Sequence, residues 1–152
     1  MRGRESGRVR WTLWSAQVFD APDLARGRKA TASSAETASL GPENAVDGDS
    51  ATRWASKYTD GEWLAVDLGE VRTVRRVLLD WEAAAGRDYD IQVTEDADGV
   101  SGWRTVAERR GRTTAGVDSV VVEPVAARHV RMSGVKRQTT YGYSLHRFEV
   151  RA

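Results

Sequence analysis

The sequence predicts an all-β fold, an antiparallel β-sandwich built as one domain. Short runs of alternating apolar and polar residues recur along most of the chain, clusters of turn residues separate them, and no segment shows helical periodicity. Strands at this spacing favour an antiparallel sandwich or barrel over parallel units joined by helices. With 152 residues the chain is long enough for one domain with a proper core and too short for two comfortable ones.

The clearest predicted strand is "EWLAVDLG", in which Leu64, Val66 and Leu68 alternate with residues of the opposite face until Gly69 ends the run. The remaining predicted strands are, in chain order, 73–81, 89–95, 103–108, 117–125, 128–135 and 144–150. Turn sequences such as "DADGVSG" and "GRTTAG" separate them. Each strand is therefore expected to be short and to have one buried face.

Residues 1–22 have a different character. Four arginines in the first ten positions precede "WTLWSAQVF", whose aromatic residues fit an added strand or the end of a preceding domain. We interpret 1–22 as an N-terminal extension or linker with a mobile start, and 23–152 as the folded domain.

Composition excludes several classes of protein. The 23 basic and 22 acidic residues leave a net charge of +1, so the chain lacks the positive field that gathers nucleic acid, and we expect no nucleic-acid partner. No apolar run approaches the roughly 20 residues needed to cross a bilayer, and the first residues lack the apolar centre of a signal peptide. Cysteine is absent, which excludes disulfides and thiolate metal sites. The basic cluster Arg109, Arg110 and Arg112 is interpreted as a solvated hairpin end.

The residues able to perform catalysis show no catalytic pattern. The two histidines, His129 and His146, have neither the spacing of a zinc motif nor an obvious nucleophile beside them. A glycosidase needs two carboxylates that face each other across a cleft, and the candidates by residue type are Glu36, Glu82, Asp88 and Asp90. Nothing in the sequence pairs them, so we expect a protein that is not an enzyme.

The most specific local pattern is "NAVDGDSATRW", from Asn44 to Trp54, which places two carboxylates, a glycine and two hydroxyl residues before an arginine and a tryptophan. An EF-hand requires glycine at its sixth position and glutamate at its twelfth. Counting from Asp47, these positions hold Thr52 and Tyr58, which excludes an EF-hand. A plain turn between two strands and a metal loop of another kind both fit, because Asp and Gly are common turn formers.

Several stretches together resemble the discoidin family, the C-terminal domains of coagulation factors V and VIII and their bacterial relatives in carbohydrate-binding module family 32. The matching stretches are "LARGRKATASSAE", "NAVDGDSATRWAS", "EWLAVDLGEVRTVRRVLLDWE", "DYDIQVTED", "GWRTV", "RHVRMSG" and "YGYSLHRFEV". They occur in the family's order and cover residues 24–150. The resemblance implies an eight-stranded jelly-roll sandwich of the galactose-binding-like type, a structural calcium ion, and a ligand site among the loops at one end.

The resemblance also implies which residues hold the calcium ion. In similar domains the loop equivalent to "NAVDGDSAT" wraps the ion and a glutamate near the C-terminus completes the shell. The implied ligands are the side chains of Asp47, Asp49, Thr52 and Glu149, helped by the backbone carbonyls of Asn44 and Phe148. Calcium takes six to eight oxygen ligands, and an ion enclosed in this way stabilises the fold rather than reacting. The plain turn remains the alternative.

The ligand site is implied by the branch that binds chitosan or glucan, whose motifs resemble "LDWEAAAGRDY", "TRWASKY" and "QTTYGYSLHRFEV". By motif, the sugar-binding residues are Glu36, Arg53, Tyr58 and Glu82, with Trp81 and Tyr141 as neighbours. The glutamates would accept hydrogen bonds from a glucosamine ammonium group, the arginine would donate to hydroxyls or orient a carboxylate, and the tyrosine would offer an apolar face with a hydroxyl.

Three of these residues, and Trp54 beside Arg53, also have a structural interpretation. Trp54 and Trp81 fit core aromatics, Arg53 fits the partner of a structural carboxylate, and Glu36 fits a solvated loop residue. All four alternatives stay open at this stage.

Two positions depart from the resemblance and bear on specificity. Ala85 stands where relatives often have tyrosine, and His146 where they often have tryptophan. An aromatic contact to the sugar is therefore expected to be missing.

Two functions fit these observations. One is a non-catalytic module that anchors a secreted glycanase to a polysaccharide, either chitosan or another glucosamine-containing polymer, or a β-glucan. The other is a discoidin-type adhesion domain that recognises a protein or a membrane. The candidate loops "SSAETASLGPEN" and "SKYTDGE" are polar and partly acidic, which favours the sugar over a membrane. The resemblance implies a secreted domain, and we expect it to be monomeric.

Overall fold

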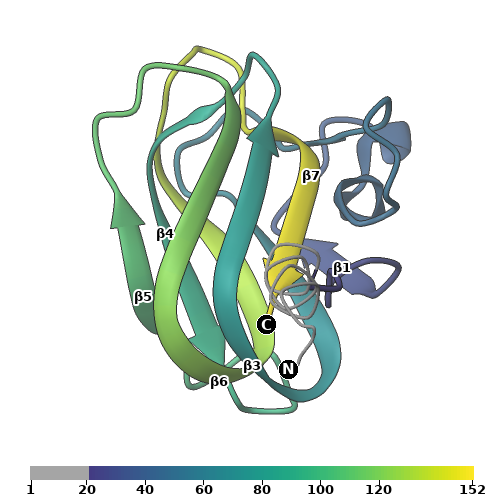
Figure 1. Ribbon diagram of the computed structural model, residues 1–152. Coiled ribbons are helices and arrows are strands. Elements are labelled where there is room, and N and C mark those ends of the chain that lie inside the picture. Colours follow the sequence, from purple (N-terminus) through teal and green to yellow (C-terminus); the bar gives the residue numbers. More distant parts are fainter. Residues whose placement is uncertain (1–20) are drawn as a thin grey trace, which may run out of the picture.

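The computed structural model describes residues 21–152, so the N-terminal extension expected at 1–22 falls almost entirely outside the described residues. Figure 1 shows the elements in chain order. The strands are β1 (Lys29–Ala32), β2 (Trp54–Ala55), β3 (Trp63–Trp81), β4 (Gly86–Thr94), β5 (Arg104–Arg109), β6 (Gly116–Arg137) and β7 (Ser144–Arg151). Two short 3₁₀ helices, η1 (Ala38–Leu40) and η2 (Pro42–Ala45), precede β2. None of the helices in residues 21–152 has the length and apolar character needed to span a membrane.

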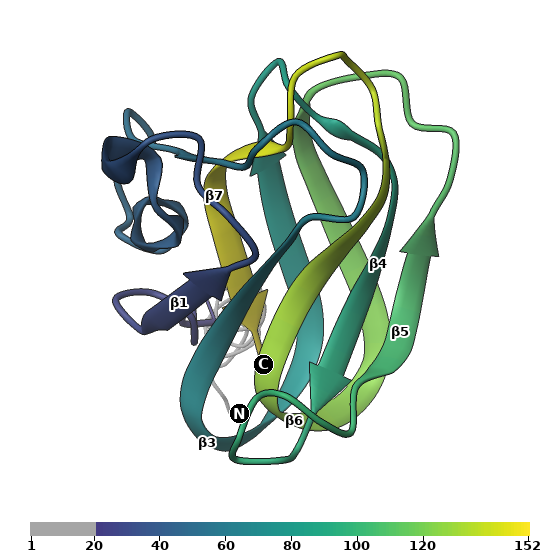
Figure 2. The ribbon, with the colours of Figure 1, turned by 180° about the vertical axis from the view of Figure 1, so that it is seen from behind.

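The strands form two layers, and β3 and β6 contribute to both (Figures 1 and 2). One layer has the strand order β1, β3, β6, β4, β5. It contains the first part of β3 and the last part of β6. In the other layer the last part of β3 lies between the first part of β6 and β7, and β2 follows. All pairings are antiparallel, which confirms the predicted all-β sandwich.

The strand boundaries differ from the prediction at the bends. The two strands predicted on either side of residue 70 form one continuous bent strand, β3. The two predicted on either side of residue 126 likewise form one bent strand, β6. The register of β3 against β6 shifts between Asp67 and Arg72 and again between Val74 and Arg76. Gly69 lies in the first shift with φ of 90°, a conformation that a residue with a Cβ rarely adopts. Residues 21–152 therefore contain seven strands, two of which serve both layers.

The core lies between the two layers. Leu64, Val66 and Leu68 have no exposed surface, as their alternation predicted. The largest fully buried side chains of the core are Trp54, Trp81, Tyr89, Tyr143 and Phe148. Burial of this apolar surface provides most of the driving force for folding.

The loops that form the site gather at one end, opposite the bends of β3 and β6 (Figures 1 and 2). Backbone hydrogen bonds join them: the N–H of Ser56 donates to the carbonyl of Tyr143 at 2.8 Å, and the N–H of Gln138 donates to that of Ala85 at 3.0 Å. Three loops distant in sequence are thereby held side by side.

Candidate functional site

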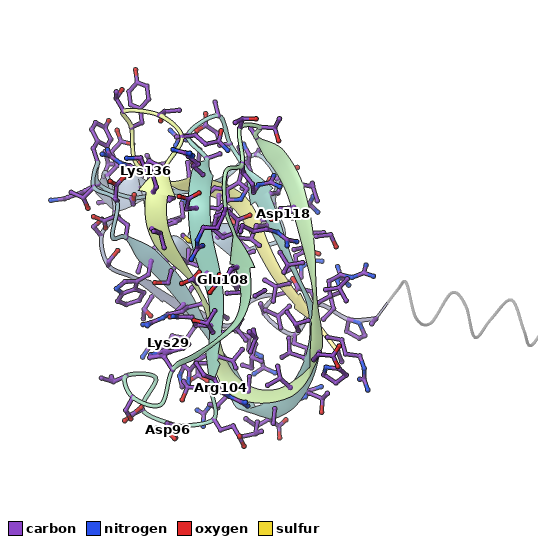
Figure 3. All side chains as sticks on the ribbon, turned by 90° about the vertical axis from the view of Figure 1, so that its left-hand side faces the viewer. Lys29, Asp96, Arg104, Glu108, Asp118 and Lys136 are labelled. Carbon is purple, nitrogen blue, oxygen red and sulfur yellow. The ribbon has the colours of Figure 1, made fainter. Side chains whose placement is uncertain are left out.

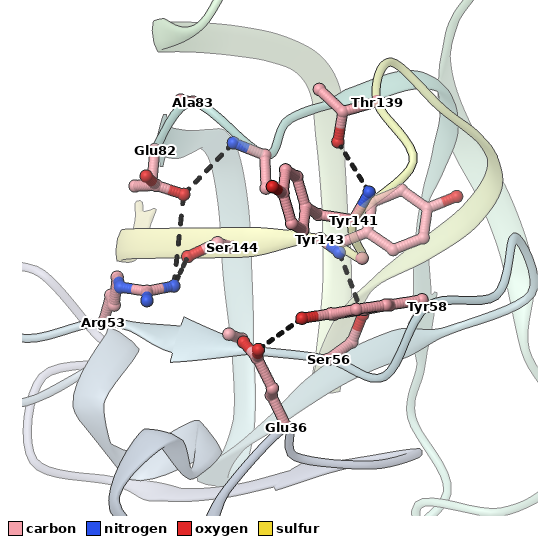
Figure 4. Close-up of a pocket in the computed structure, with 13 residues that line it drawn as sticks. Glu36, Arg53, Ser56, Tyr58, Glu82, Ala83, Thr139, Tyr141, Tyr143 and Ser144 are labelled. Atoms are coloured by element: carbon pink, nitrogen blue, oxygen red, sulfur yellow. Dashed lines mark hydrogen bonds and ion pairs between the residues drawn. The ribbon is translucent and has the colours of Figure 1, made fainter.

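A pocket of about 310 Å³ opens at this loop end of the sandwich (Figure 4). Its walls come from four segments: the stretch before η1, β2 with the residues on either side of it, the β3–β4 loop, and the β6–β7 loop with the start of β7. The predicted sugar-binding residues Glu36, Arg53, Tyr58 and Glu82 all line it, and so does Tyr141. We call this cavity the glycan pocket, after the ligand that the sequence predicts for it.

One side of the glycan pocket is formed by Glu36 and Tyr58. The Tyr58 hydroxyl donates a hydrogen bond of 2.5 Å to Oε2 of Glu36, and this bond is the main reason why the pKa of Tyr58 is raised. The backbone N–H of Glu36 donates to the carbonyl of Ala55 at 2.7 Å, which ties the segment before η1 to β2. Glu36 is an exposed loop residue, as its structural alternative described, but Tyr58 holds its carboxylate on the pocket wall.

The opposite side is formed by Arg53 and Glu82. Nη1 of Arg53 donates to Oγ of Ser144 at 2.8 Å and lies 4.0 Å from Oε1 of Glu82. The Glu82 carboxylate accepts a hydrogen bond from the N–H of Ala84 at 3.1 Å, and the N–H of Glu82 donates to the carbonyl of Ser144 at 3.0 Å. About a third of each charged side chain is exposed, so both can still reach a ligand. The 4.0 Å separation between Arg53 and Glu82 makes this a weak ion pair.

Two tyrosine rings form the rim. Tyr58 and Tyr141 meet edge to face, with ring centroids 5.7 Å apart and planes at 88°. Their side chains remain 47% and 59% exposed, respectively. Exposed aromatic rings with hydroxyl groups suit a ligand that has both apolar faces and hydroxyls.

Gly142 allows the β6–β7 loop to lie against the loop after β2. A Cβ at this position would lie 2.5 Å from the carbonyl oxygen of Lys57 and 2.7 Å from that of Ser56, so only glycine fits. At the same contact, Oγ of Ser56 accepts a hydrogen bond from the N–H of Tyr143 at 2.9 Å. The "YGYS" sequence therefore shapes the pocket floor.

Trp81, which was predicted as a neighbour of the sugar, lies elsewhere. It is 2% exposed, it does not line the glycan pocket, and its Nε1 donates to the Tyr89 hydroxyl at 3.2 Å. Trp54 is likewise fully buried. Both tryptophans take the core positions that their structural alternative described. Alternation along β3 with the buried Val77 and Leu79 is the sequence signal that points Trp81 inward.

Other residues of the pocket were missed by sequence reasoning. Ser144 orients Arg53 and Ser56 anchors the β6–β7 loop, and Ala83, Thr139 and Tyr143 complete the wall. The signal that was available is the "TTYGYS" stretch, from which only Tyr141 was selected.

A buried carboxylate supports the loop that carries Tyr58. Glu62 is 8% exposed and accepts hydrogen bonds from the hydroxyls of Ser33 at 2.7 Å, Ser34 at 2.5 Å and Thr59. Burial by itself raises the pKa of Glu62, but the hydroxyl hydrogen bonds outweigh it and hold that pKa below its usual value. The ionised carboxylate thus fastens the loop to the segment before η1.

The two departures from the resemblance lie at different places. Ala85 is a fully buried residue of the β3–β4 loop and does not line the glycan pocket. Nδ1 of His146 lies 3.1 Å from the carbonyl oxygen of Thr52, next to the loop predicted to bind calcium. The position of His146 therefore bears on the calcium loop rather than on the sugar.

The loop predicted to bind calcium gathers oxygen atoms around Thr52. Its Oγ1 lies 2.7 Å from Oδ2 of Asp47, 2.9 Å from the carbonyl oxygen of Asp49 and 3.2 Å from that of Asn44. The Asp47 and Asp49 carboxylates also accept hydrogen bonds from backbone N–H groups two residues ahead, each at 2.9 Å. Carboxylate, hydroxyl and carbonyl oxygens are the ligand types that calcium requires, so the donor set of this loop fits the ion.

The C-terminal part of the predicted calcium shell is arranged differently. The Glu149 carboxylate accepts hydrogen bonds from Nη1 of Arg147 at 3.0 Å and from Nη2 of Arg151 at 2.6 Å. The Phe148 side chain is fully buried, and its residue pairs with Leu79 of β3. Within residues 21–152 no three acidic or histidine side chains cluster as metal ligands. Glu149 would have to leave its arginine partners to reach an ion in the loop.

Residues 29–150 and the fold that they form resemble those of known proteins. The profile of the F5/8 type C domain family matches residues 29–150. A mutant of chitosan-binding module 1 from a chitosanase/glucanase of Paenibacillus sp. IK-5 is 43% identical, with a TM-score of 0.84 over 87% of this chain and 99% of that one. Chitosan-binding module 2 of the same enzyme, solved in complex with chitotriose, is 37% identical, with a TM-score of 0.83 over 86% of this chain and 100% of that one.

A curated protein matches over a shorter stretch. The polysaccharide lyase 8 family protein HylA of Enterococcus faecalis (strain ATCC 700802 / V583) is 34% identical over 96 residues, in a match that covers 57% of this chain. The chain spans only 7% of the length of HylA.

Proposed function

The chain belongs to the F5/8 type C domain family, and we propose that it is a non-catalytic carbohydrate-binding module that holds a secreted glycanase on its polysaccharide. The observation that carries this proposal is the glycan pocket, where Glu36, Arg53, Tyr58 and Glu82 meet although they lie far apart in sequence. Under this proposal residues 23–152 form a monomeric binding module and 1–22 link it to a preceding domain.

The proposed ligand is a polymer that contains β-linked glucosamine, such as chitosan, with a neutral β-glucan as the weaker candidate. Two carboxylates on opposite walls can accept charge-assisted hydrogen bonds from an ammonium group, and Arg53 can donate to hydroxyls between them. The complex of the related module with chitotriose supports this choice of sugar. Tyr58 and Tyr141 would pack against the apolar faces of the sugar rings.

Weak binding without chemical turnover is expected. An open pocket that makes a few hydrogen bonds gives a dissociation constant of roughly micromolar to millimolar, equivalent to about −8 to −4 kcal/mol. That range suits a module whose role is to keep an enzyme near an insoluble polymer.

The same site geometry argues against adhesion to a membrane. Among the exposed large apolar side chains of residues 21–152, the two that line the glycan pocket are tyrosines, Tyr58 and Tyr141. Membrane insertion favours aliphatic or aromatic tips without a nearby carboxylate, whereas Glu36 accepts the Tyr58 hydrogen bond at this rim.

Calcium is proposed as a structural ion in the loop from Asn44 to Thr52. The oxygens of Asn44, Asp47, Asp49 and Thr52 support it, and Glu149 would complete the shell after leaving its arginine partners. Bound there, the ion would supply a cross-link within the loop and no chemistry.

Titration calorimetry with chitotriose tests the proposed function. Hydrogen bonds to charged groups contribute about 1.5–3 kcal/mol, so Glu36→Ala and Glu82→Ala are each expected to weaken binding about tenfold or more while the protein stays folded. Glu123→Ala, which removes an exposed carboxylate of β6 outside the pocket, is the matched control and should bind like wild type. Binding that is unchanged in both pocket variants would show that the sugar lies elsewhere.

A further inference from the structure

A second pocket lies beside the glycan pocket at the same end of the sandwich. It measures about 160 Å³ and is lined by Arg87, Arg112, Thr113 and Gln138, and we call it the arginine pocket. Gln138 joins its walls, because its Nε2 donates to the carbonyls of Gly86 at 3.0 Å and Thr114 at 2.8 Å. The next residue along the chain, Thr139, lines the glycan pocket, so one loop forms part of both cavities.

The charge of Arg112 is incompletely neutralised. Asp118 is its acidic partner, with Nη1 of Arg112 3.7 Å from Oδ1. That carboxylate already accepts hydrogen bonds from Nε of Arg109 at 2.9 Å and Nη2 at 3.3 Å, and another from the Tyr89 hydroxyl. Figure 3 shows Asp118 toward the end of the sandwich where Lys136 lies, which is the end that carries the β6–β7 loop, and far from Asp96 at the other end. One carboxylate therefore serves two guanidinium groups beside the arginine pocket.

Burial fixes the position of Arg112. Its side chain is 22% exposed, and its Nε is buried with no hydrogen-bond partner among residues 21–152. A buried donor without a partner is unfavourable, because it has lost its hydrogen bond to water without gaining another. The interpretation of this cluster as a solvated hairpin end is therefore wrong for Arg112, and also for Arg109, which is held by Asp118.

Arg87 supplies the second positive charge. Its side chain is 50% exposed, and its Nε is 4.0 Å from Oδ1 of Asp88, which also accepts a hydrogen bond from the N–H of Gly111 at 2.7 Å. Such a long, exposed ion pair contributes little and leaves the guanidinium able to bind another anion. With the hydroxyl of Thr113, the pocket presents mainly hydrogen-bond donors.

We propose that the arginine pocket binds a carboxylate or sulfate group on the sugar unit next to the one held by Glu36 and Glu82. This inference rests on the proposed function of the glycan pocket. Guanidinium groups bind both anions through paired hydrogen bonds. Apart from Glu82, the β3–β4 loop contributes only the small side chains of Ala83 and Ala84 to the wall of the glycan pocket, so no large side chain of this loop stands in the way of a longer sugar chain. The module then prefers a glycan that alternates amino and acidic sugars to one with an ammonium group on every unit.

Four tetrasaccharides test this preference by titration calorimetry. N-deacetylated hyaluronan tetrasaccharide alternates glucosamine with glucuronic acid, and its carboxyl-reduced form replaces each carboxylate by a neutral hydroxymethyl group. Chitotetraose has an ammonium group on every unit, and its 6-O-sulfated form adds the alternative anion. The deacetylated hyaluronan tetrasaccharide is compared with its carboxyl-reduced form, and sulfated chitotetraose with chitotetraose. In at least one of these two pairs, the wild type is expected to bind the anionic sugar about threefold to tenfold more tightly.

Arg87→Gln should abolish this preference, because it removes an exposed guanidinium without disturbing the core. Arg110→Gln is the matched control: it removes a charge from the neighbouring hairpin, where Arg110 pairs with Asp90 at 2.9 Å outside the pocket. The control should keep the preference of the wild type. An equal loss in both variants would show a long-range charge effect and would overturn the assignment.

The outcomes separate this inference from the proposed function. If the wild type binds each anionic probe no better than its matched probe, while chitotetraose binding still depends on Glu36 and Glu82, only the arginine pocket is wrong. If chitotetraose binding does not depend on the two glutamates, the proposed function itself fails. Equal preference for carboxylate and sulfate would identify an anion site that does not distinguish the two.

Discussion

The Tyr58 hydroxyl donates a hydrogen bond of 2.5 Å to Oε2 of Glu36, across 22 residues of sequence, and this contact holds a carboxylate on the wall of the glycan pocket. Because the same carboxylate is proposed to bind the sugar, the tyrosine acts both as a rim residue and as the support of Glu36. The two roles can be separated by substitution.

Tyr58→Phe keeps the ring and removes the hydroxyl. We expect the affinity for chitotriose to fall about threefold to tenfold, because Glu36 loses the donor that positions it. Tyr58→Ala should weaken binding further, since the ring is lost as well. Calorimetry on both variants measures the two contributions. If Tyr58→Phe binds as tightly as wild type, the hydrogen bond has no part in recognition.

Salt should affect the binding of charged and neutral sugars differently. Contacts between carboxylates and ammonium groups weaken as the salt concentration rises from about 0.05 M to about 0.5 M, because dissolved ions screen the charges. Chitotriose affinity is therefore expected to fall with added salt, whereas the affinity for the neutral cellotriose should hardly change. Calorimetric titrations of both sugars measure this, and equal sensitivity of the two would contradict a role for charge.

Calcium should raise the thermal stability if it binds only the folded state. Removing a ligand that binds only the native form lowers stability by mass action, so a chelator is expected to lower the melting temperature by about 5 °C or more, and added calcium should restore it. Asp47→Ala should abolish the response, while Asp96→Ala, in the β4–β5 loop, should retain it. Identical melting curves with and without chelator, on protein shown to be free of metal, would exclude the ion.

Gly142→Ala should damage the pocket floor. The added methyl group would lie 2.5 Å from the Lys57 carbonyl oxygen, so the two loops must separate. Overpacking of this kind destabilises by about 1–3 kcal/mol, and chitotriose affinity should fall with it. Gly61→Ala is the matched control, because a Cβ there meets nothing within 4 Å. Urea unfolding and calorimetry measure both effects. A Gly142→Ala protein with wild-type affinity would show that the loop contact does not shape the site.

Glu62 should make stability depend on pH in the acid range. Its folded-state pKa is held below the ordinary value of 4.5 by hydroxyl hydrogen bonds that outweigh burial. A depressed pKa contributes stability that is fully present above the unfolded-state pKa and is lost as the pH falls through the folded-state pKa. Glu62→Gln is expected to lower the free energy of unfolding at neutral pH by about 1–2 kcal/mol and to flatten its fall below about pH 4.5. Urea unfolding from neutral to acid pH measures this, and an unchanged slope would show that Glu62 does not titrate with folding.

The predicted and observed strands show which features local sequence determines. Alternation in "EWLAVDLG" sets which face is buried, because successive side chains of a strand point to opposite sides. The same rule places Trp81 inward with Val77 and Leu79. Gly69 carries a turn signal in the sequence, but in the structure it allows β3 to bend from one layer into the other. A turn between two strands and a bend within one strand use the same residue types, so local sequence does not distinguish them.

The residues of the glycan pocket were named from motifs, but their assembly is a property of the tertiary structure. The sequence by itself determined the all-β class, the inward face of each strand and the residue types available for binding. Tertiary packing alone brings Arg53 to Ser144, 91 residues away, and places Glu149 between two arginines. The physical reason is range: alternation and turn preference act between neighbours along the chain, whereas a pocket depends on strand register and loop contacts that form only when distant segments pack together.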